Sequence, residues 1–156
     1  MNPQSPARRH TATVDESAPA VVRLTAIVRA PLDRLWDLHT DIAAWPAWNP
    51  GISRAEPAGP LAVGTVFHWH THGLDITSTV LEAVPGRRLV WGGPAHGIDG
   101  IHAWTFEDAG DGTVAVRTEE SWSGPPVDAD PDAARHALRE SLGLWLAALK
   151  AAAERP

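Results

Sequence analysis

Six segments typical of β-strands follow one another between residues 51 and 123, and this run constrains the fold more than any other feature. Most of them are rich in β-branched and aromatic residues, and short turn signals rich in glycine separate them. The segments are GISRAEPA, GTVFHWHT, LDITSTVLEAV, RRLVWGG, IDGIHAWTFED and GTVAVRTEESW. Turns this short predict hairpins between neighbouring strands.

The segments on either side of this run complete the element order. Residues 21–30 (VVRLTAIVRA) predict a strand that ends at Pro31. Two short helices should follow, PLDRLWDLHT and then DIAAWPAWN, which Asp41 can cap and Pro46 breaks. From Pro131 the chain should be helical to its end, with an apolar stripe of Leu138, Leu142, Trp145, Leu149 and Ala152. The order is one strand, two short helices, six strands and one long helix, in one α+β domain spanning 21–154.

Residues 1–20 are rich in proline, alanine, serine and threonine and show no hydrophobic periodicity. Such a segment buries too little apolar surface to offset the entropy of ordering. We expect a disordered N-terminal arm over 1–20 that can be removed without loss of stability.

Composition excludes several classes of function. The 156 residues include no cysteine, which rules out disulfides and thiol chemistry and fits a cytoplasmic location. The net charge of −6 argues against a nucleic-acid partner. No apolar run approaches the roughly 20 residues that a membrane helix needs, so we expect no membrane insertion. Eight tryptophans stand against two phenylalanines and no tyrosine, and tryptophan suits both a core and a surface that holds an organic ligand.

The element order resembles the START-like helix-grip superfamily (SRPBCC), in its polyketide cyclase/dehydrase and lipid transport branch. The segments that carry the resemblance include APLDRLWDL, DIAAWPAWNPGI, PLAVGTVFHW, GIHAWTFE, GTVAVRTEES and LWLAALKAAAE, within residues 21–154. The resemblance implies a curved seven-stranded antiparallel sheet around the long C-terminal helix, with an apolar cavity between them. It leaves the chemistry open, because this scaffold carries cyclases, dehydratases, hydrolases, ligand carriers and chaperone-like modules.

Hairpin register predicts which side chains face that cavity. If His72-Gly73 is a two-residue turn, Trp69 pairs with Ile76 and Phe67 with Ser78. On the opposite face His70 then meets Asp75, and the pattern places His68 and His70 toward solvent. Extending the register through the next hairpins gives one concave lining: Phe67, Trp69, Ile76, Ser78, Val80, Leu89, Trp91, His102, Trp104, Phe106, Val114, Val116, Thr118 and Glu120.

His102 and Glu120 are the polar candidates for chemistry on this lining. Around the turn DAGDG we expect Phe106 opposite Val114, Trp104 opposite Val116 and His102 opposite Thr118, so that Glu120 lies diagonal to His102. Such a pair has three interpretations: it transfers protons as a catalytic acid and base, it hydrogen-bonds a ligand, or it is structural.

Further ligand contacts are expected from the lining and from the long helix. These residues are Phe67, Trp69, Ser78, Trp91, Trp104, Thr118 and Trp145. The resemblance implies that His72 and His96 flank the cavity mouth, although exposed loop histidines are the plainer interpretation. No metal site and no cofactor are expected, because two of the three histidines of His68, His70 and His72 face solvent.

The sequence supports three hypotheses about function. The first is a cyclase or dehydratase that folds a hydrophobic, aromatic or polyketide-like molecule while His102 and Glu120 move protons. The second is a non-catalytic carrier or sensor, for which tryptophan-lined walls suffice. The third is an interaction module of the chaperone-cofactor type. Leu144 and Leu146, outside the main helical stripe, are either a surface for a homodimer or ordinary surface leucines.

Overall fold

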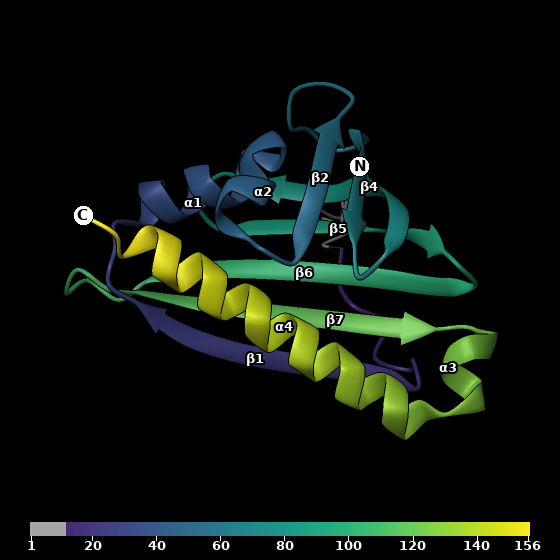
Figure 1. Ribbon diagram of the computed structural model, residues 1–156. Coiled ribbons are helices and arrows are strands. Elements are labelled where there is room, and N and C mark those ends of the chain that lie inside the picture. The colour runs from purple at the N-terminus through teal and green to yellow at the C-terminus, as the bar shows by residue number, and fades with distance from the viewer. Residues whose placement is uncertain (1–11) are drawn as a thin grey trace, which may run out of the picture.

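A seven-stranded antiparallel sheet and a long helix lying across one of its faces make up the fold (Figure 1). The structure is a computed structural model that describes residues 12–156. The elements are β1 (Ala20–Val28), α1 (Leu32–Thr40), η1 (Ile42–Ala44), α2 (Trp45–Trp48), β2 (Ile52–Pro57), β3 (Val66–Thr71), β4 (Leu74–Val84), β5 (Arg88–Ala95), β6 (Ile98–Asp108), β7 (Val114–Ser123), α3 (Pro125–Ala129) and α4 (Pro131–Ala153). This confirms the predicted α+β helix-grip fold.

The sheet order is β1-β7-β6-β5-β4-β3-β2, so the first strand pairs with the last. The five hairpin connections from β2 to β7 account for all neighbours except β1, which joins β7 along the whole of its length. The two short helices span the long connection from β1 to β2 at the opposite edges of the sheet, as Figure 1 shows. The sequence analysis overlooked α3, a single short helix that precedes α4.

The long helix begins where the sequence predicted it. The Asp130 carboxylate accepts a hydrogen bond from the Ala133 backbone N–H at 3.1 Å, and Pro131 occupies the first turn. The five residues of the predicted apolar stripe are all buried. Leu146 is buried with them, while Leu144 is 62% exposed. The expectation that both leucines lie on the surface is therefore wrong for Leu146, which belongs to the core.

The hairpin between β3 and β4 has the predicted register. Trp69 pairs with Ile76, Phe67 with Ser78, and His70 with Asp75. Phe67 and Trp69 are buried in the main hydrophobic core between the sheet and α4, so this face of the strands is the inner one.

Two later hairpins correct the predicted register. In the hairpin of β4 and β5, continuing the two-residue alternation from Val80 opposite Trp91 would pair Leu89 with Glu82, but a register shift between Val80 and Glu82 places Leu89 opposite Ala83. In the hairpin between β6 and β7 the true pairs are Phe106 with Val116, Trp104 with Thr118, and His102 with Glu120. The prediction was two residues off in this hairpin. Because side chains alternate with a period of two, the error left every residue on the predicted face.

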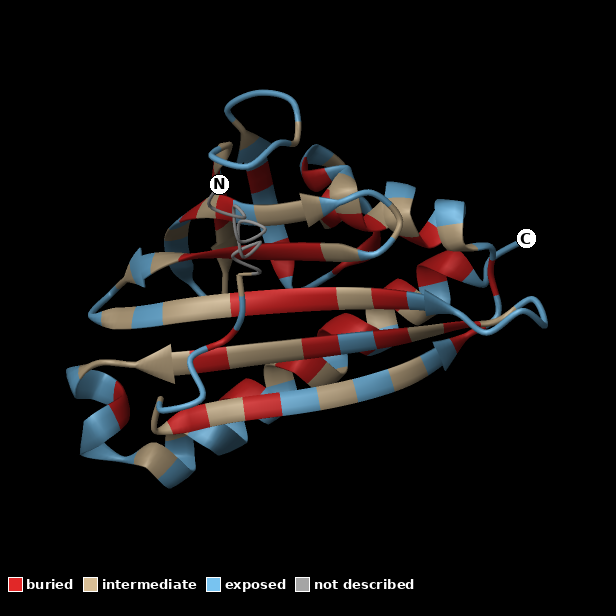
Figure 2. Cartoon of the chain, turned by 180° about the vertical axis from the view of Figure 1, so that it is seen from behind, coloured by how far each residue is buried: buried red, intermediate tan, exposed pale blue. Residues whose placement is uncertain are grey.

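Residues 12–19 differ from the predicted disordered arm. They run over the convex face of the sheet (Figure 2), where Val14 is buried in a small cluster with Val90 and Ala103. The Asp15 backbone N–H donates to Ser121 Oγ at 2.9 Å, and Arg88 donates to the Ala12 carbonyl at 2.8 Å. The remainder of the predicted arm, residues 1–11, lies outside the described residues. Within residues 12–156 no helix is both long enough and apolar enough to cross a membrane.

Candidate functional site

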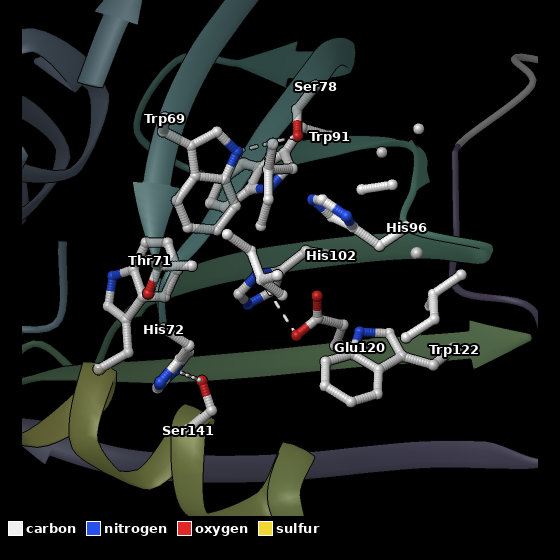
Figure 3. A pocket seen from close by; sticks show the side chains of 18 of the residues that line it. Trp69, Thr71, His72, Ser78, Trp91, His96, His102, Glu120, Trp122 and Ser141 are labelled. Carbon is white, nitrogen blue, oxygen red and sulfur yellow. Dashed lines mark hydrogen bonds and ion pairs between the residues drawn. The ribbon is translucent and has the colours of Figure 1, made fainter. Parts of the chain in front are cut away.

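A cavity of about 510 Å³ lies between the inner face of the sheet and one side of α4 (Figure 3). The strands contribute aromatic and small residues, and α4 contributes a second row of side chains beside its apolar stripe. Its principal lining residues are Trp69, Ile76, Ser78, Trp91, Gly92, Gly93, Gly100, His102, Glu120 and Trp122 from the sheet, and Ala137, Glu140, Ser141, Leu144 and Trp145 from α4. The volume is that of a site for a small organic molecule.

The structure brings most of the predicted site residues to this cavity. Trp69, Ser78, Trp91 and Trp145 line it together with His102, Glu120 and the predicted mouth residues His72 and His96. Contact of these residues with a ligand stays a prediction.

Three residues predicted as ligand contacts do not line the cavity. Phe67, Trp104 and Thr118 are completely buried behind it. The alternation of the strands put them on the correct face, but neighbouring side chains cover them.

Adjacent strands hold His102 and Glu120 directly opposite each other. His102 Nδ1 lies 3.8 Å from Glu120 Oε2, and His102 Nε2 is hydrogen-bonded to Thr118 Oγ1 at 2.8 Å. The imidazole is almost wholly buried, whereas the carboxyl side chain is 17% exposed, toward the cavity. A separation of 3.8 Å is too long for a direct hydrogen bond, so each group keeps capacity for another partner.

Burial keeps both groups uncharged near neutral pH. Loss of solvation raises the pKa of Glu120 to about 8, and a hydrogen bond from the Trp122 side chain opposes part of this rise. Burial and the nearby His39 hold the pKa of His102 well below its ordinary value. The site therefore presents a carboxylic acid and a neutral imidazole at one end of a mainly apolar cavity.

A hydrogen bond between Trp69 and Ser78 gives each of these cavity-lining side chains a polar partner. Trp69 Nε1 donates to Ser78 Oγ at 3.1 Å, across the hairpin of β3 and β4. The bond fixes the plane of the Trp69 ring, which faces the cavity beside Trp91 (Figure 3). The Trp145 ring of α4 meets Trp69 edge to face, with ring centroids 5.6 Å apart. Flat aromatic walls of this kind suit a planar ligand.

Two histidines in tight turns border the mouth. His72 and His96 both have positive φ, 50° and 53°, and a glycine of positive φ follows each, as two-residue hairpin turns require. His72 Nε2 lies 3.2 Å from Ser141 Oγ on α4, and His96 Nε2 lies 2.9 Å from the Asp75 carbonyl. The tips of two hairpins are thus joined to their neighbours at the edge of the cavity.

Several residues of the site were missed at the level of the sequence. Trp122 is one same-face step beyond Glu120 on β7, and the alternation could have identified it. Ala137, Ser141 and Leu144 follow helical spacing beside the predicted stripe, and Glu140 lies next to them.

His39 is a fully buried residue that sequence reasoning missed. Its ring lies among Trp45, Trp91, Trp104 and Trp145, neither ring nitrogen has a hydrogen-bond partner, and burial lowers its pKa to about 4. Its position four residues after Leu35, on the apolar face of α1, was the available signal.

His68 and His70 lie on the convex side, as predicted. His68 Nδ1 is 2.9 Å from Thr77 Oγ1, and His70 Nδ1 is 2.8 Å from the Asp75 carboxylate. Across residues 12–156 the structure groups no three histidine, aspartate or glutamate side chains in a way that could hold a metal ion.

Comparison with known proteins places the chain in a described family. The sequence profile for the family described as polyketide cyclase / dehydrase and lipid transport matches residues 19–154. No curated protein matches the sequence.

Solved structures with the same fold cover nearly the whole chain. A hypothetical protein from Helicobacter pylori is 20% identical with a TM-score of 0.79, covering 92% of this chain and 98% of its own. A START superfamily protein from Mycobacterium smegmatis is 14% identical with a TM-score of 0.72, covering 86% and 97%. A Streptomyces aromatase/cyclase is 19% identical with a TM-score of 0.73, covering 86% and 93%. At these identities the likeness shows the fold alone.

Proposed function

Because the chain belongs to the polyketide cyclase/dehydrase and lipid transport family, we propose that it binds a hydrophobic, aromatic or polyketide-like molecule and promotes its cyclisation or dehydration. The observation that carries the proposal is that Glu120 and His102 face each other at 3.8 Å on the lining of a mainly apolar cavity, where burial opposes the charge of both groups. An acid and a base of this kind are what a carbon–carbon condensation and the following loss of water need. The similarity of the fold to a Streptomyces aromatase/cyclase supports the same proposed activity.

The proposed reaction uses the two groups as acid and base in turn. His102 removes a proton from the carbon between two carbonyls of the substrate. The resulting enolate carbon attacks a third carbonyl, farther along the same molecule, to form the new bond. Glu120 gives its proton to the oxygen of that carbonyl. For dehydration, the imidazolium returns its proton to the departing hydroxyl, and the Glu120 carboxylate removes a proton from the adjacent carbon. Both residues then regain their starting protonation states, and one water molecule has left.

The aromatic walls would orient the substrate for this step. Trp69, Trp91 and Trp145 present ring faces and edges to the cavity, and Ser78 fixes the first of them. Holding the two reacting carbons in contact lowers the entropic cost of bringing them together in the transition state. His72 and His96 would border the entering molecule at the mouth.

A carrier or sensor is the second candidate, because the tryptophan-lined cavity alone accounts for binding. The 3.8 Å separation of His102 and Glu120 is compatible with either role, since a ligand oxygen between them can simply be held or can take part in a reaction. An interaction module of the chaperone-cofactor type gains no support from a cavity of about 510 Å³.

The test compares binding with turnover in matched variants. Ligand binding is followed by quenching of tryptophan emission, and turnover by chromatography of poly-β-ketone substrates of different chain length. We expect Glu120→Gln and His102→Phe to lower turnover by about 10²–10⁴-fold while affinity changes only a few-fold. Glu107→Gln, which alters an exposed carboxyl of β6 outside the cavity lining, is the control and should retain turnover.

Two outcomes would contradict the proposal in different ways. Clear dissociation constants without turnover on any of these substrates would leave a carrier. Absence of binding by every aromatic or polyketide-like probe would show that the cavity has another role.

A further inference from the structure

The gap between His102 Nδ1 and Glu120 Oε2 has the dimensions of a site for one ligand atom. The two atoms lie 3.8 Å apart, and both side chains face the cavity (Figure 3). An oxygen about 2.8–3.0 Å from each of them completes an isosceles triangle with normal hydrogen-bond lengths. A second atom of the same ligand group has no place between them, so the gap suits a single oxygen.

The remaining contacts of the pair determine which kind of oxygen fits. Thr118 Oγ1 lies 2.8 Å from His102 Nε2, and when this hydroxyl donates to the ring, the proton of the neutral imidazole is on Nδ1 and points into the gap. The uncharged Glu120 carboxyl carries a second proton, and the Trp122 side chain already bonds to that carboxyl. Two donors then converge on one acceptor. A ketone oxygen satisfies both, and a phenol oxygen accepts from one while donating to the other.

The charges around the cavity exclude the commonest alternative, a fatty or aromatic carboxylate. Among the described residues that line it, Glu120 and Glu140 are the carboxyl groups and none is lysine or arginine. A carboxylate seated in the gap would lose its hydration without a lysine or arginine beside it, and the other two histidines of the lining, His72 and His96, border the mouth. The carboxylate would also lie beside Glu120, whose own ionisation is opposed by poor solvation.

We propose that the gap between Glu120 and His102 binds one uncharged oxygen of the ligand, a ketone carbonyl or a phenol, and that the cavity selects against carboxylates. The inference rests on the proposed function, because it specifies the chemical class of the molecule held in that cavity. It adds that the reacting carbonyl itself occupies the gap. In the reaction described above, His102 acts as the base in its other tautomer, in which Nε2–H donates to Thr118 Oγ1 and Nδ1 is free. Glu120 donates to the oxygen in either tautomer, so it stabilises the negative charge that develops there.

The experiment uses three probes of one shape: 2-acetonaphthone, 2-ethylnaphthalene and 2-naphthoate. Their affinities for the full chain are measured at pH 7 by quenching of tryptophan emission. The ketone should bind about tenfold more tightly than the hydrocarbon, the value of one well-placed hydrogen bond, and 2-naphthoate at least tenfold more weakly than the ketone. Glu120→Leu should remove the preference for the ketone over the hydrocarbon. Glu120→Gln retains a donor and should preserve most of it.

A matched control separates the gap from the rest of the surface. Glu107→Gln changes an exposed carboxyl of β6 outside the lining and should leave the ketone preference intact, whereas loss of that preference in this variant would overturn the assignment to the gap. Equal binding of the three probes by the parent protein would overturn the oxygen site and leave the apolar cavity of the proposed function standing. Tightest binding of 2-naphthoate would overturn the charge argument alone. Absence of binding by all three would contradict the proposed function and the inference together.

Discussion

At the scale of single residues, the proposed chemistry depends on two groups whose surroundings oppose their charge. Glu120 is placed against indole and imidazole rings, and His102 is sealed among Trp91, Trp104 and Trp145. Neither would be unusual on a protein surface. Their pairing across β6 and β7, under an aromatic layer, makes them an acid and a base that do not neutralise each other.

Glu120 should also make stability depend on pH. Its pKa is about 8 in the folded state and 4.5 in a freely solvated carboxyl, so between these values the folded state holds a proton that the unfolded state has lost. The stability that this group contributes is complete below about pH 4.5 and falls as the pH rises toward about 8. Each unit of the shift corresponds to about 1.4 kcal/mol, so the full effect is a few kcal/mol at most.

The measurement is urea denaturation of the parent and of Glu120→Gln at pH 5, 6.5 and 8. The variant should gain in free energy of unfolding relative to the parent as the pH rises, because its amide does not ionise. Glu140→Gln, at an exposed position, should run parallel to the parent. A constant difference between the parent and Glu120→Gln across this range would show that Glu120 ionises normally in the folded protein.

At the scale of elements, two glycines on the paired strands β5 and β6 have different roles: substitution of one should change the shape of the cavity, and substitution of the other should disturb the sheet. A Cβ at Gly100 on β6 would meet Trp122 Cδ1 at 3.5 Å, an ordinary contact, and would project into the cavity. A Cβ at Gly92 on β5 would lie 2.7 Å from the Gly100 carbonyl oxygen, which backbone pairing holds in place. The first position tolerates a side chain and the second does not.

Gly100→Ala should therefore fold with nearly the melting temperature of the parent and bind 2-acetonaphthone more weakly. Gly92→Ala should lower the melting temperature by several degrees, because a strand must shift to relieve the overlap. Differential scanning fluorimetry and emission quenching measure the two effects. Unchanged affinity in Gly100→Ala would indicate that the ligand does not reach this part of the cavity.

The N-terminal segment before β1 contributes to stability through the convex face of the sheet. Val14 is 3% exposed and packs on Val90 and Ala103. Val14→Ala removes two buried methyl groups and should cost about 1–2 kcal/mol, measured by chemical denaturation. Thr13→Ala, one position earlier and exposed, is the control. If both variants unfold like the parent, the segment adds nothing to the stability of the domain.

At the scale of the whole molecule, the inner face of the sheet lines the cavity, and residues 12–19 cover part of the convex face. The histidines of β3 belong to the second face, where His68 and His70 are already paired with Thr77 and Asp75. Elemental analysis of protein purified without chelator should therefore find less than one equivalent of zinc, nickel or iron. One equivalent that disappears in a variant carrying both His68→Ala and His70→Ala would contradict this expectation.

The sequence by itself determined the elements and the faces of the strands. Glycine turns and β-branched runs specify hairpins locally, and a period of two decides which side chains share a face whatever the exact register. For this reason the two-residue error between β6 and β7 still placed His102 and Glu120 on the inner face. The apolar spacing of α4 likewise identified the helix and its buried stripe.

Only the tertiary structure decided which of the inward residues reach the cavity and how they are protonated. Phe67, Trp104 and Thr118 share a face with Trp69 and His102 but are covered by neighbours from other elements. The contribution of α4 to the mouth, the deep burial of His39 and the packing of Val14 on the convex face also depend on contacts between segments far apart in the chain. The local sequence pattern determines the face of the strand from which a side chain projects. Its distance to other groups, its burial and its pKa depend on which residues from the rest of the chain pack against it.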